Sequence, residues 1–281
     1  MNTKKKSFSI TKLLGKILVA IGILIFLYPL CANLIKAQQT VNIVQKYESS
    51  LNHQSKSDID KKLLDAEDYN NYIFSMSEHN AYDGNIPKYN KTLNNGNRGM
   101  MGYVSIPQIS ISNLPIYHGD DQKTLELGVG HIEQTSLPIG GENSHSVLSA
   151  HSGRANNTLF SNLDKLKKGD VFYVNVLNKK MKYKINDIRI VKPKDVSSLS
   201  VKKGEDLVTL LTCYPTGINT HRLLVTGTRI PYNEKVPQEK QARNKFGYNF
   251  WVILVGSLLV IIAIIYIIVI FLKKLKDRRK K

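Results

Sequence analysis

Cysteine is scarce in this chain, whose 281 residues contain only Cys31 and Cys213. With a single cysteine outside the first hydrophobic run, neither a disulfide framework nor a zinc site built on paired thiolates is supported. Acidic residues are also in the minority, with 22 Asp and Glu against 40 Lys and Arg. No internal repeat is evident. The sequence therefore predicts a non-repetitive fold without covalent or thiolate-metal crosslinks.

Long hydrophobic runs, in contrast, are present near both ends. Residues 250–272 form 23 consecutive uncharged residues, which as a helix would be about 34 Å long and would cross a bilayer. Residues 17–35 form a second run of 19 residues, interrupted by Pro29 and Asn33. A cleaved signal peptide is the alternative for this second run, but no convincing cleavage site follows Leu30. We therefore predict two transmembrane helices, the first retained as an anchor.

Basic residues are concentrated beside these two runs. Five lysines lie in residues 1–16 and a net charge of +6 lies in residues 273–281, together 11 of the formal +18. By the positive-inside rule, both tails are expected in the cytoplasm and residues 36–249 outside the cell. The basic character of the chain is thus explained by the membrane, and nucleic-acid binding loses most of its support.

Between the two runs, the spacing of apolar residues changes at about residue 100. In residues 36–75, apolar residues recur at helical spacing, which predicts two amphipathic helices broken near 52–57. Residues 76–99 show little periodicity and are expected to form a loop. Residues 100–231 contain short apolar runs closed by turn-forming residues, which predicts a mostly β domain of the barrel or sandwich type. Seven strand-like runs are MGYVSIP, NLPIYH, SVLSAH, VFYVNVL, MKYKINDIRIV, LVTLLTC and HRLLVTGTRI. A short helix is expected at TLFSNLDKL (158–166), and residues 232–249 read as a polar tether.

Cys213 is the best candidate for chemistry. Cys31 lies in the first hydrophobic run and is interpreted as a small apolar residue, so Cys213 is the only cysteine in the exported part. A free reactive thiol is one interpretation, and an inert buried cysteine is the other. A thiol attacks as thiolate and needs a nearby base or cation. The turn-rich loop YPTGINT would bring Arg222 on the next strand to the same rim, although Arg222 could equally be a surface residue.

Five histidines in the β domain compete for the role of the base. His145 and His151 are separated by about 20 Å of strand, so only one of them can approach the thiol. His151 ends an apolar run at a turn, which is the expected position for a group at a rim, and His145 is expected at the opposite rim. His118 and His131 are interpreted as turn or core hydrogen-bonding residues. His221 neighbours Arg222 and is expected on the opposite face of the same strand.

The runs TLLTC, HRLLVTGTR, SHSVLSAHSG, LPIYHG, GVGHIEQTSLPIGG and MMGYVSIP together resemble a class C sortase, the pilin-polymerising type, over residues 99 to 231. The resemblance implies a closed eight-stranded β-barrel, one strand more than the runs counted above. It also implies that Cys213 is the nucleophile, His151 the acid and base, and Arg222 the group that holds the signal or stabilises the oxyanion. The implied reaction cleaves the Thr-Gly bond of an LPXTG-like signal through a thioacyl enzyme. The implied partners are pilin or surface-protein substrates, the lysine amine of another pilin, and the membrane lipid.

One departure from this family concerns the lid. Pilin sortases commonly carry an Asp-Pro-aromatic triplet that plugs the active site, but residues 76–99 contain no Asp-Pro pair, and Asp83 is followed by Gly84. Autoinhibition by a plugging lid is therefore not expected. No metal or cofactor is expected either, because the histidines lack ligand spacing and Glu126, Glu133 and Asp164 are scattered.

Three alternatives to a pilin sortase remain open. A housekeeping sortase would anchor many surface proteins to the cell wall, but the two terminal runs argue against it. A papain-like or cell-wall cysteine hydrolase would usually place its thiol at a helix N-terminus, whereas TLLTC reads as a strand followed by a turn. A membrane-anchored binding module without activity would make the candidate residues incidental.

Overall fold

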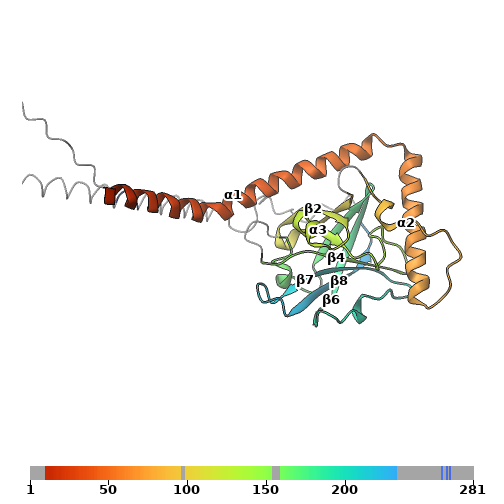
Figure 1. Cartoon of the computed structure of the whole chain (residues 1–281). Coiled ribbons are helices and arrows are strands. Elements are labelled where there is room, and N and C mark those ends of the chain that lie inside the picture. Colours follow the sequence, from red (N-terminus) through yellow and green to blue (C-terminus); the bar gives the residue numbers. More distant parts are fainter. Residues whose placement is uncertain are drawn as a thin grey trace, which may run out of the picture.

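The seven apolar runs all form strands, and these strands close into a barrel. The computed structural model describes residues 10–95, 99–153 and 159–232, together with residues 261, 264 and 266. The strands are β1 (Met100–Ile106), β2 (Ile111–His118), β3 (Val129–His131), β4 (Ser144–Ser149), β5 (Val171–Val176), β6 (Lys179–Val191), β7 (Asp206–Tyr214) and β8 (His221–Ile230). The helices are α1 (Ile10–Asn52), α2 (Lys56–Ser77) and α3 (Gln122–Leu127), with four single turns of 3-10 helix, η1 (Tyr89–Lys91), η2 (Pro107–Ile109), η3 (Leu163–Lys165) and η4 (Ser197–Leu199) (Figure 1).

The barrel closes in the order β1-β2-β3-β4-β7-β8-β6-β5. Two neighbouring pairs are parallel, β2 with β3 and β4 with β7, and the others are antiparallel. The expected mostly β, closed eight-stranded fold is confirmed. The strand that run counting missed is β3, which has only three residues and contains Gly130, so it is too short to show a periodic pattern. Its pairing with β2 and β4 makes it a strand.

The interior of the barrel is apolar and aromatic. Phe172 and Tyr183 stack at its centre, with their ring centroids 5.4 Å apart and an angle of 13° between the ring planes. Gly227 lies against this pair, and a Cβ at residue 227 would approach Phe172 Cε1 to 2.6 Å. The absence of a side chain on β8 at this point therefore lets the stacked rings fit inside the barrel.

The helix α1 is longer than the sequence predicted. Residues 17–35 and the first expected amphipathic helix form one continuous helix that passes Pro29, which we had expected to interrupt it. Proline removes only one N–H donor, and helix-forming residues on both sides continue the helix. The predicted break is confirmed, because α1 ends at Asn52 and α2 begins at Lys56, with the Ser55 hydroxyl accepting from Asp58 N at 3.1 Å.

The described part of the chain contains no helix that is both long enough and apolar enough to span a bilayer. Of the predicted span 250–272, only residues 261, 264 and 266 are described, each as helical. The tails 1–9 and 273–281 and most of the tether 232–249 lie outside the described residues. That residues 17–35 and 250–272 cross a membrane therefore stays a prediction.

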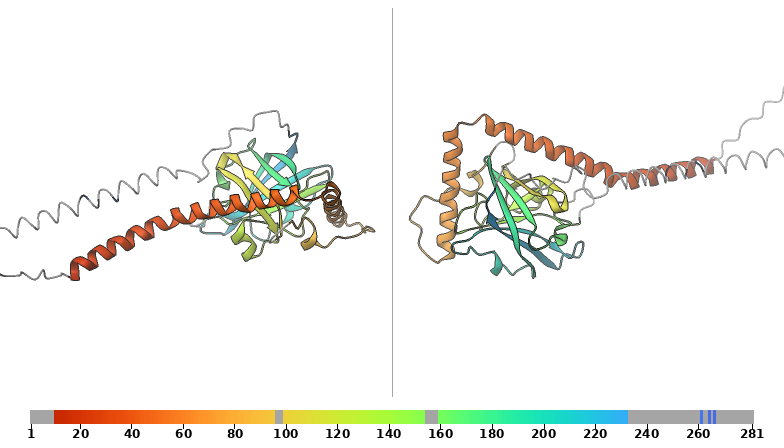
Figure 2. Two further views of the ribbon diagram at one scale, coloured as in Figure 1. Left: turned by 90° about the horizontal axis from the view of Figure 1, so that it is seen from above. Right: turned by 180° about the vertical axis from the view of Figure 1, so that it is seen from behind.

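The second half of α1 packs on the barrel, as the views in Figure 2 show. Its Tyr47 hydroxyl donates to Met101 O at 2.8 Å and accepts from Leu177 N at 3.0 Å, so one side chain joins α1 to β1 and to the end of β5. Burial raises the pKa of Tyr47 to about 12. The neighbouring Glu48 carboxylate accepts from Tyr103 at 2.7 Å. This half of α1 is thus held by specific polar contacts as well as by apolar packing.

The helix α2 is held to the barrel by a buried amide. Asn70 accepts from Leu137 N at 2.6 Å and donates to Leu137 O at 3.2 Å, so its side chain pairs with a backbone unit as a neighbouring strand would. Tyr69, one residue earlier, donates to Glu133 O. Both contacts fix α2 to the segment between β3 and β4.

The predicted short helix at 158–166 is wrong in extent. Within the described residues 159–166 only η3 is helical, and Phe160 N donates to His151 O at 3.1 Å. Leu159 has a φ of 36°, in the left-handed region that a helix cannot use. The backbone here forms a turn that reaches back to the end of β4, because the left-handed Leu159 interrupts the expected helix near its start.

Candidate active site

Three predicted site residues lie at the ends of three consecutive strands of the barrel. Cys213 of β7 is directly opposite Arg222 of β8 in the antiparallel register, so both side chains project from the same face of the sheet. The parallel strand β4 runs beside β7 with Ser149 level with Leu211, and Ala150 N donates to Leu211 O at 3.1 Å. Continuing this register by two residues brings His151 level with Cys213. The fold therefore brings His151, Cys213 and Arg222 to one rim.

These residues face outward from the barrel. Val208 and Leu210 of β7 belong to the interior core, so alternation along the strand turns Leu211 and Cys213 to the outer face. A second group of buried apolar residues is separate from the interior core and lies on this outer face; it consists of Val147, Leu207 and Leu224. The outer face of β4, β7 and β8 thus has an apolar floor, and the three site residues, each half-buried, lie at one end of it.

The thiol of Cys213 is free and half-buried. Its own carbonyl oxygen accepts from the Ser152 hydroxyl at 2.8 Å. The preceding residue, Thr212, points the other way, and its hydroxyl donates to Ala150 O at 2.7 Å. Thr212 and Cys213 are therefore both bonded to the residues that follow β4. These bonds fix the position of Cys213 relative to the segment that carries His151.

The guanidinium of Arg222 is held by the loop between β7 and β8. Its Nη1 donates to Asn219 O at 3.2 Å and to His221 O at 3.0 Å. The loop itself is a tight turn in which Ile218 N and Asn219 N both donate to Pro215 O at 3.0 Å, and Asn219 has a φ of 64°. Among the hydrogen bonds of the described residues, Nη2 and Nε of Arg222 are not used, so these donors are available to a ligand.

His118 and His131 have structural roles, which confirms the prediction. His118 lies between two backbone carbonyls, with Nδ1 2.9 Å from Gly99 O and Nε2 2.7 Å from Thr92 O. His131 is 0% exposed, and its Nε2 is 2.8 Å from Ser136 O. Burial lowers the pKa of His131 to about 4. Both histidines hold segments together, and neither is part of the rim.

His145 and His221 are also where the sequence predicted them. His145 lies at the start of β4, level with Leu207 and therefore at the far end from Cys213. It is 1% exposed, with Nδ1 2.9 Å from Ser200 O and Nε2 2.7 Å from the Thr209 hydroxyl. Burial lowers the pKa of His145. His221 is opposite Tyr214 rather than Cys213, so it projects from the other face of the strand.

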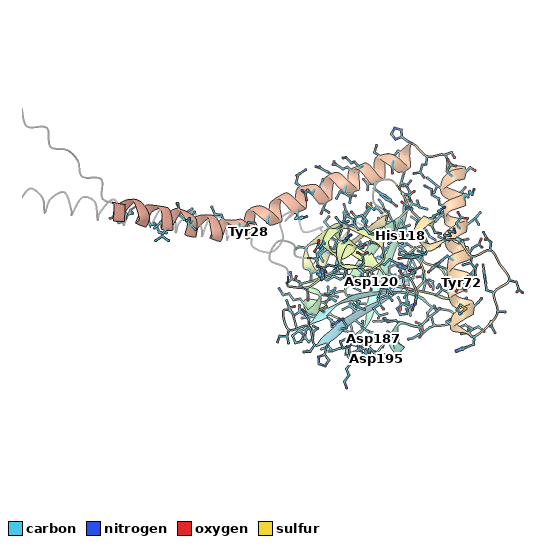
Figure 3. The ribbon with its side chains drawn as sticks, viewed as in Figure 1. Tyr28, Tyr72, His118, Asp120, Asp187 and Asp195 are labelled. Carbon is cyan, nitrogen blue, oxygen red and sulfur yellow. The ribbon has the colours of Figure 1, made fainter. Side chains whose placement is uncertain are left out.

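The segment 76–99, where the family resemblance would place a lid, is anchored away from this rim. Tyr82 donates to Asp68 O of α2 at 3.2 Å, and Tyr89 donates to His131 O at 2.8 Å while accepting from Gly119 N at 2.9 Å. Figure 3 labels His118, on the side of the barrel that faces α2, and its ring centroid is 5.0 Å from that of Tyr89. Of this segment, residues 96–98 lie outside the description.

Two residues that sequence reasoning missed support the site. Ser152 bonds the carbonyl of Cys213, and Asn219 supplies a carbonyl to Arg222. A serine directly after the candidate histidine and an asparagine in a turn were visible signals, but their partners depend on which strands are neighbours. Across the described ranges, no group of three or more His, Cys, Asp or Glu side chains is arranged to hold a metal ion.

Comparison with known proteins places the barrel in one family. The model of the sortase domain matches residues 104–230. A sortase C structure from Clostridium perfringens, which includes the C-terminal cell wall sorting motif, is 43% identical with a TM-score of 0.61 and covers 68% of this chain and 100% of that chain. Sortase C1 of Streptococcus agalactiae is 42% identical with a TM-score of 0.63 and the same coverage. Among curated proteins, sortase D of Bacillus subtilis (strain 168) is 33% identical over 132 residues, 46% of this chain and 63% of that protein.

Proposed function

The chain belongs to the sortase family of cysteine transpeptidases, and we propose that Cys213 is its nucleophile, His151 its general acid and base, and Arg222 its oxyanion or signal-holding group. The observation that carries this proposal is the strand register. It sets Cys213 opposite Arg222, and the register of β4 with β7, continued two residues past Ser149, brings His151 level with Cys213. A nucleophile flanked by a base and a cation on one exposed face is the arrangement that thiol acyl transfer needs.

The proposed reaction has two steps. In the first, the Cys213 thiolate attacks the threonine carbonyl of an LPXTG-like signal, the Thr-Gly C–N bond breaks, and His151 gives its proton to the leaving glycine amine. In the second, an amine attacks the thioester, His151 takes a proton from it, and the Cys213 thiolate leaves.

Arg222 suits a role in binding an oxyanion or the signal. Two backbone carbonyls hold its Nη1, which orders the side chain before a substrate arrives, and its other donors are unused in the described structure. Donors that are already positioned stabilise a developing negative charge without reorganisation.

We further propose that the acceptor is the lysine amine of a pilin subunit and that the enzyme polymerises pilins. The similarity to sortase C structures at 42% and 43% identity supports this type. The alternative of a housekeeping sortase rests on the weaker similarity to sortases of other types, such as sortase A of S. agalactiae at 29% identity.

Anchoring in the cell membrane is also part of the proposal. The uncharged run 250–272, the run 17–35 and the basic residues beyond them support two spans with both termini in the cytoplasm. The barrel would then work outside the cell, close to the lipid surface. The continuity of α1 from residues 17–35 to the docked Tyr47 supports a fixed connection between the first span and the barrel.

An acylation assay on the full-length chain tests the proposed function. The purified protein in detergent is incubated with an LPXTG-type peptide, and mass spectrometry is used to detect an acyl adduct on Cys213. We expect the adduct on the wild type and a loss of at least about a thousandfold in turnover for Cys213→Ala. Cys31→Ala is the matched control and should retain activity. If the wild type neither forms an adduct nor cleaves any such peptide, the proposed function is wrong.

A further inference from the structure

The turn that follows β4 is tied to the residue that carries the thiol. Ser152, directly after His151, donates its hydroxyl hydrogen to Cys213 O at 2.8 Å, and this contact is partly buried. The bond therefore joins the backbone of the candidate nucleophile to the neighbour of the candidate base.

This bond continues the ladder between β4 and β7 by one step. The last backbone bond between the strands runs from Ala150 N to Leu211 O, and the next position in a parallel ladder joins residue 152 to residue 213. The chain turns here, with Gly153 at a φ of 74°. The hydroxyl of Ser152 thus supplies a donor at the position where the backbone leaves the sheet.

The other sides of the turn are also fixed. Phe160 N donates to His151 O at 3.1 Å, and Gly153 N donates to the Ser161 hydroxyl at 2.9 Å. A Cβ at residue 153 would come within 2.9 Å of Thr216 Cγ2, so the turn packs closely against the loop between β7 and β8. The Ser152 bond adds a direct hydrogen bond between this turn and the backbone of the residue that carries the thiol.

We infer that Ser152 is a positioning residue, whose hydroxyl sets the separation between the His151 imidazole and the Cys213 thiol. The inference rests on the proposed roles of His151 and Cys213. Without the hydroxyl, the turn loses its link to β7 and the imidazole moves away from the thiol. Displacement of a catalytic group by about 1 Å lowers the rate of the chemical step strongly but leaves ground-state binding nearly unchanged.

Two measurements on the full-length chain test this inference. The first is kcat and KM with an LPXTG-type peptide. The second is the rate of alkylation of Cys213 by iodoacetamide across the pH range, followed by peptide mapping, which reports thiolate formation without any substrate. For Ser152→Ala we expect kcat to fall on the order of tenfold with little change in KM. We also expect its alkylation profile to move to higher pH, toward that of His151→Ala. Ser152→Thr keeps the hydroxyl and should restore both.

Ser144→Ala is the matched control, because Ser144 makes a similar hydroxyl-to-carbonyl bond to Gly141 at 2.6 Å at the other end of β4. It should lower the melting temperature without changing kcat or the alkylation profile. The inference is overturned if Ser152→Ala keeps the wild-type kcat and profile, or if it behaves like Ser144→Ala. If the wild type never reacts with the peptide, the proposed function fails, and the alkylation profiles alone then support or overturn the role of Ser152.

Discussion

Each end of the outer face of β4 and β7 carries a histidine, and the two histidines differ in burial. At one end, His145 is 1% exposed and has hydrogen-bond partners for both ring nitrogens, one of them Ser200 in the segment between β6 and β7. At the other end, His151 is half-buried, level with a free thiol and an arginine. His145 lies on β4, and His151 follows the end of that strand by two residues. The segment between β6 and β7 binds and buries His145, whereas His151 is only half-buried.

The largest effects should come from replacing these two histidines separately. His151→Ala should lower turnover by about 10²- to 10⁴-fold with little change in stability, because a general acid and base is lost. His145→Ala should cost about 1–3 kcal/mol of unfolding free energy, since Ser200 O loses its bond to the imidazole and the Thr209 hydroxyl keeps only Thr226 as a partner. Peptide turnover and denaturant unfolding measure the two effects. If both variants lost turnover equally, the assignment of a catalytic role to His151 and a structural role to His145 would be wrong.

At the reactive end, Arg222→Lys should have the next largest effect. Lysine keeps the charge but loses the planar set of donors that lets Arg222 hold two loop carbonyls with Nη1 and still offer Nη2 and Nε. We expect turnover to fall by about 100-fold. Steady-state kinetics with an LPXTG-type peptide measures this loss. Full activity in the lysine variant would exclude a role in binding the oxyanion or the signal.

Low pH should destabilise the protein through its buried histidines, His131 and His145. Burial lowers the pKa of His131 to about 4, whereas an unfolded histidine titrates near 6.5. The unfolded state therefore binds the proton first, and stability that is fully present above about pH 6.5 is lost as the pH falls toward 4, by about 3 kcal/mol. His145 contributes in the same direction.

Denaturant unfolding at several pH values measures this loss. His131→Gln keeps a hydrogen-bonding side chain that does not titrate, so its stability should depend less on pH across this range. An equal pH dependence in the wild type and the variant would show that His131 is not the group responsible.

The smallest effect should come from loosening the segment that corresponds to a lid. Tyr82→Phe removes the hydroxyl that donates to Asp68 O, and Tyr89→Phe removes the bonds to His131 O and Gly119 N. We expect less than about twofold change in peptide turnover, because these anchors lie near β2, β3 and α2 rather than at the rim. Tyr89→Phe should cost about 1–3 kcal/mol of stability. A strong rise in turnover in either variant would instead indicate an inhibitory lid.

Much of the secondary structure could be predicted from short stretches of the sequence. The alternating or continuous apolar runs predicted seven of the strands, and the helical spacing on both sides of residues 53–55 predicted the helix break. The strand β3 and the turn at 159–162 could not be predicted from periodicity. Three residues with a central glycine have no readable period, and the turn depends on the left-handed Leu159 and on the bond from Phe160 N to His151 O, which no periodic pattern indicates.

The sequence by itself determined the alternating pattern of the strands, the single thiol of Cys213 at a strand end, and the turn that brings Arg222 opposite it. Short-range periodicity and turn chemistry suffice for these features, because they involve residues close together in the chain. Only the tertiary structure decided that β4 lies beside β7, which brings His151 level with the thiol and Ser152 onto its carbonyl. The burial of His145, which bonds to Ser200, likewise depends on which end of the sheet the segment between β6 and β7 covers. Burial and pairing across some sixty residues depend on the closure of the whole barrel, and no local pattern records them.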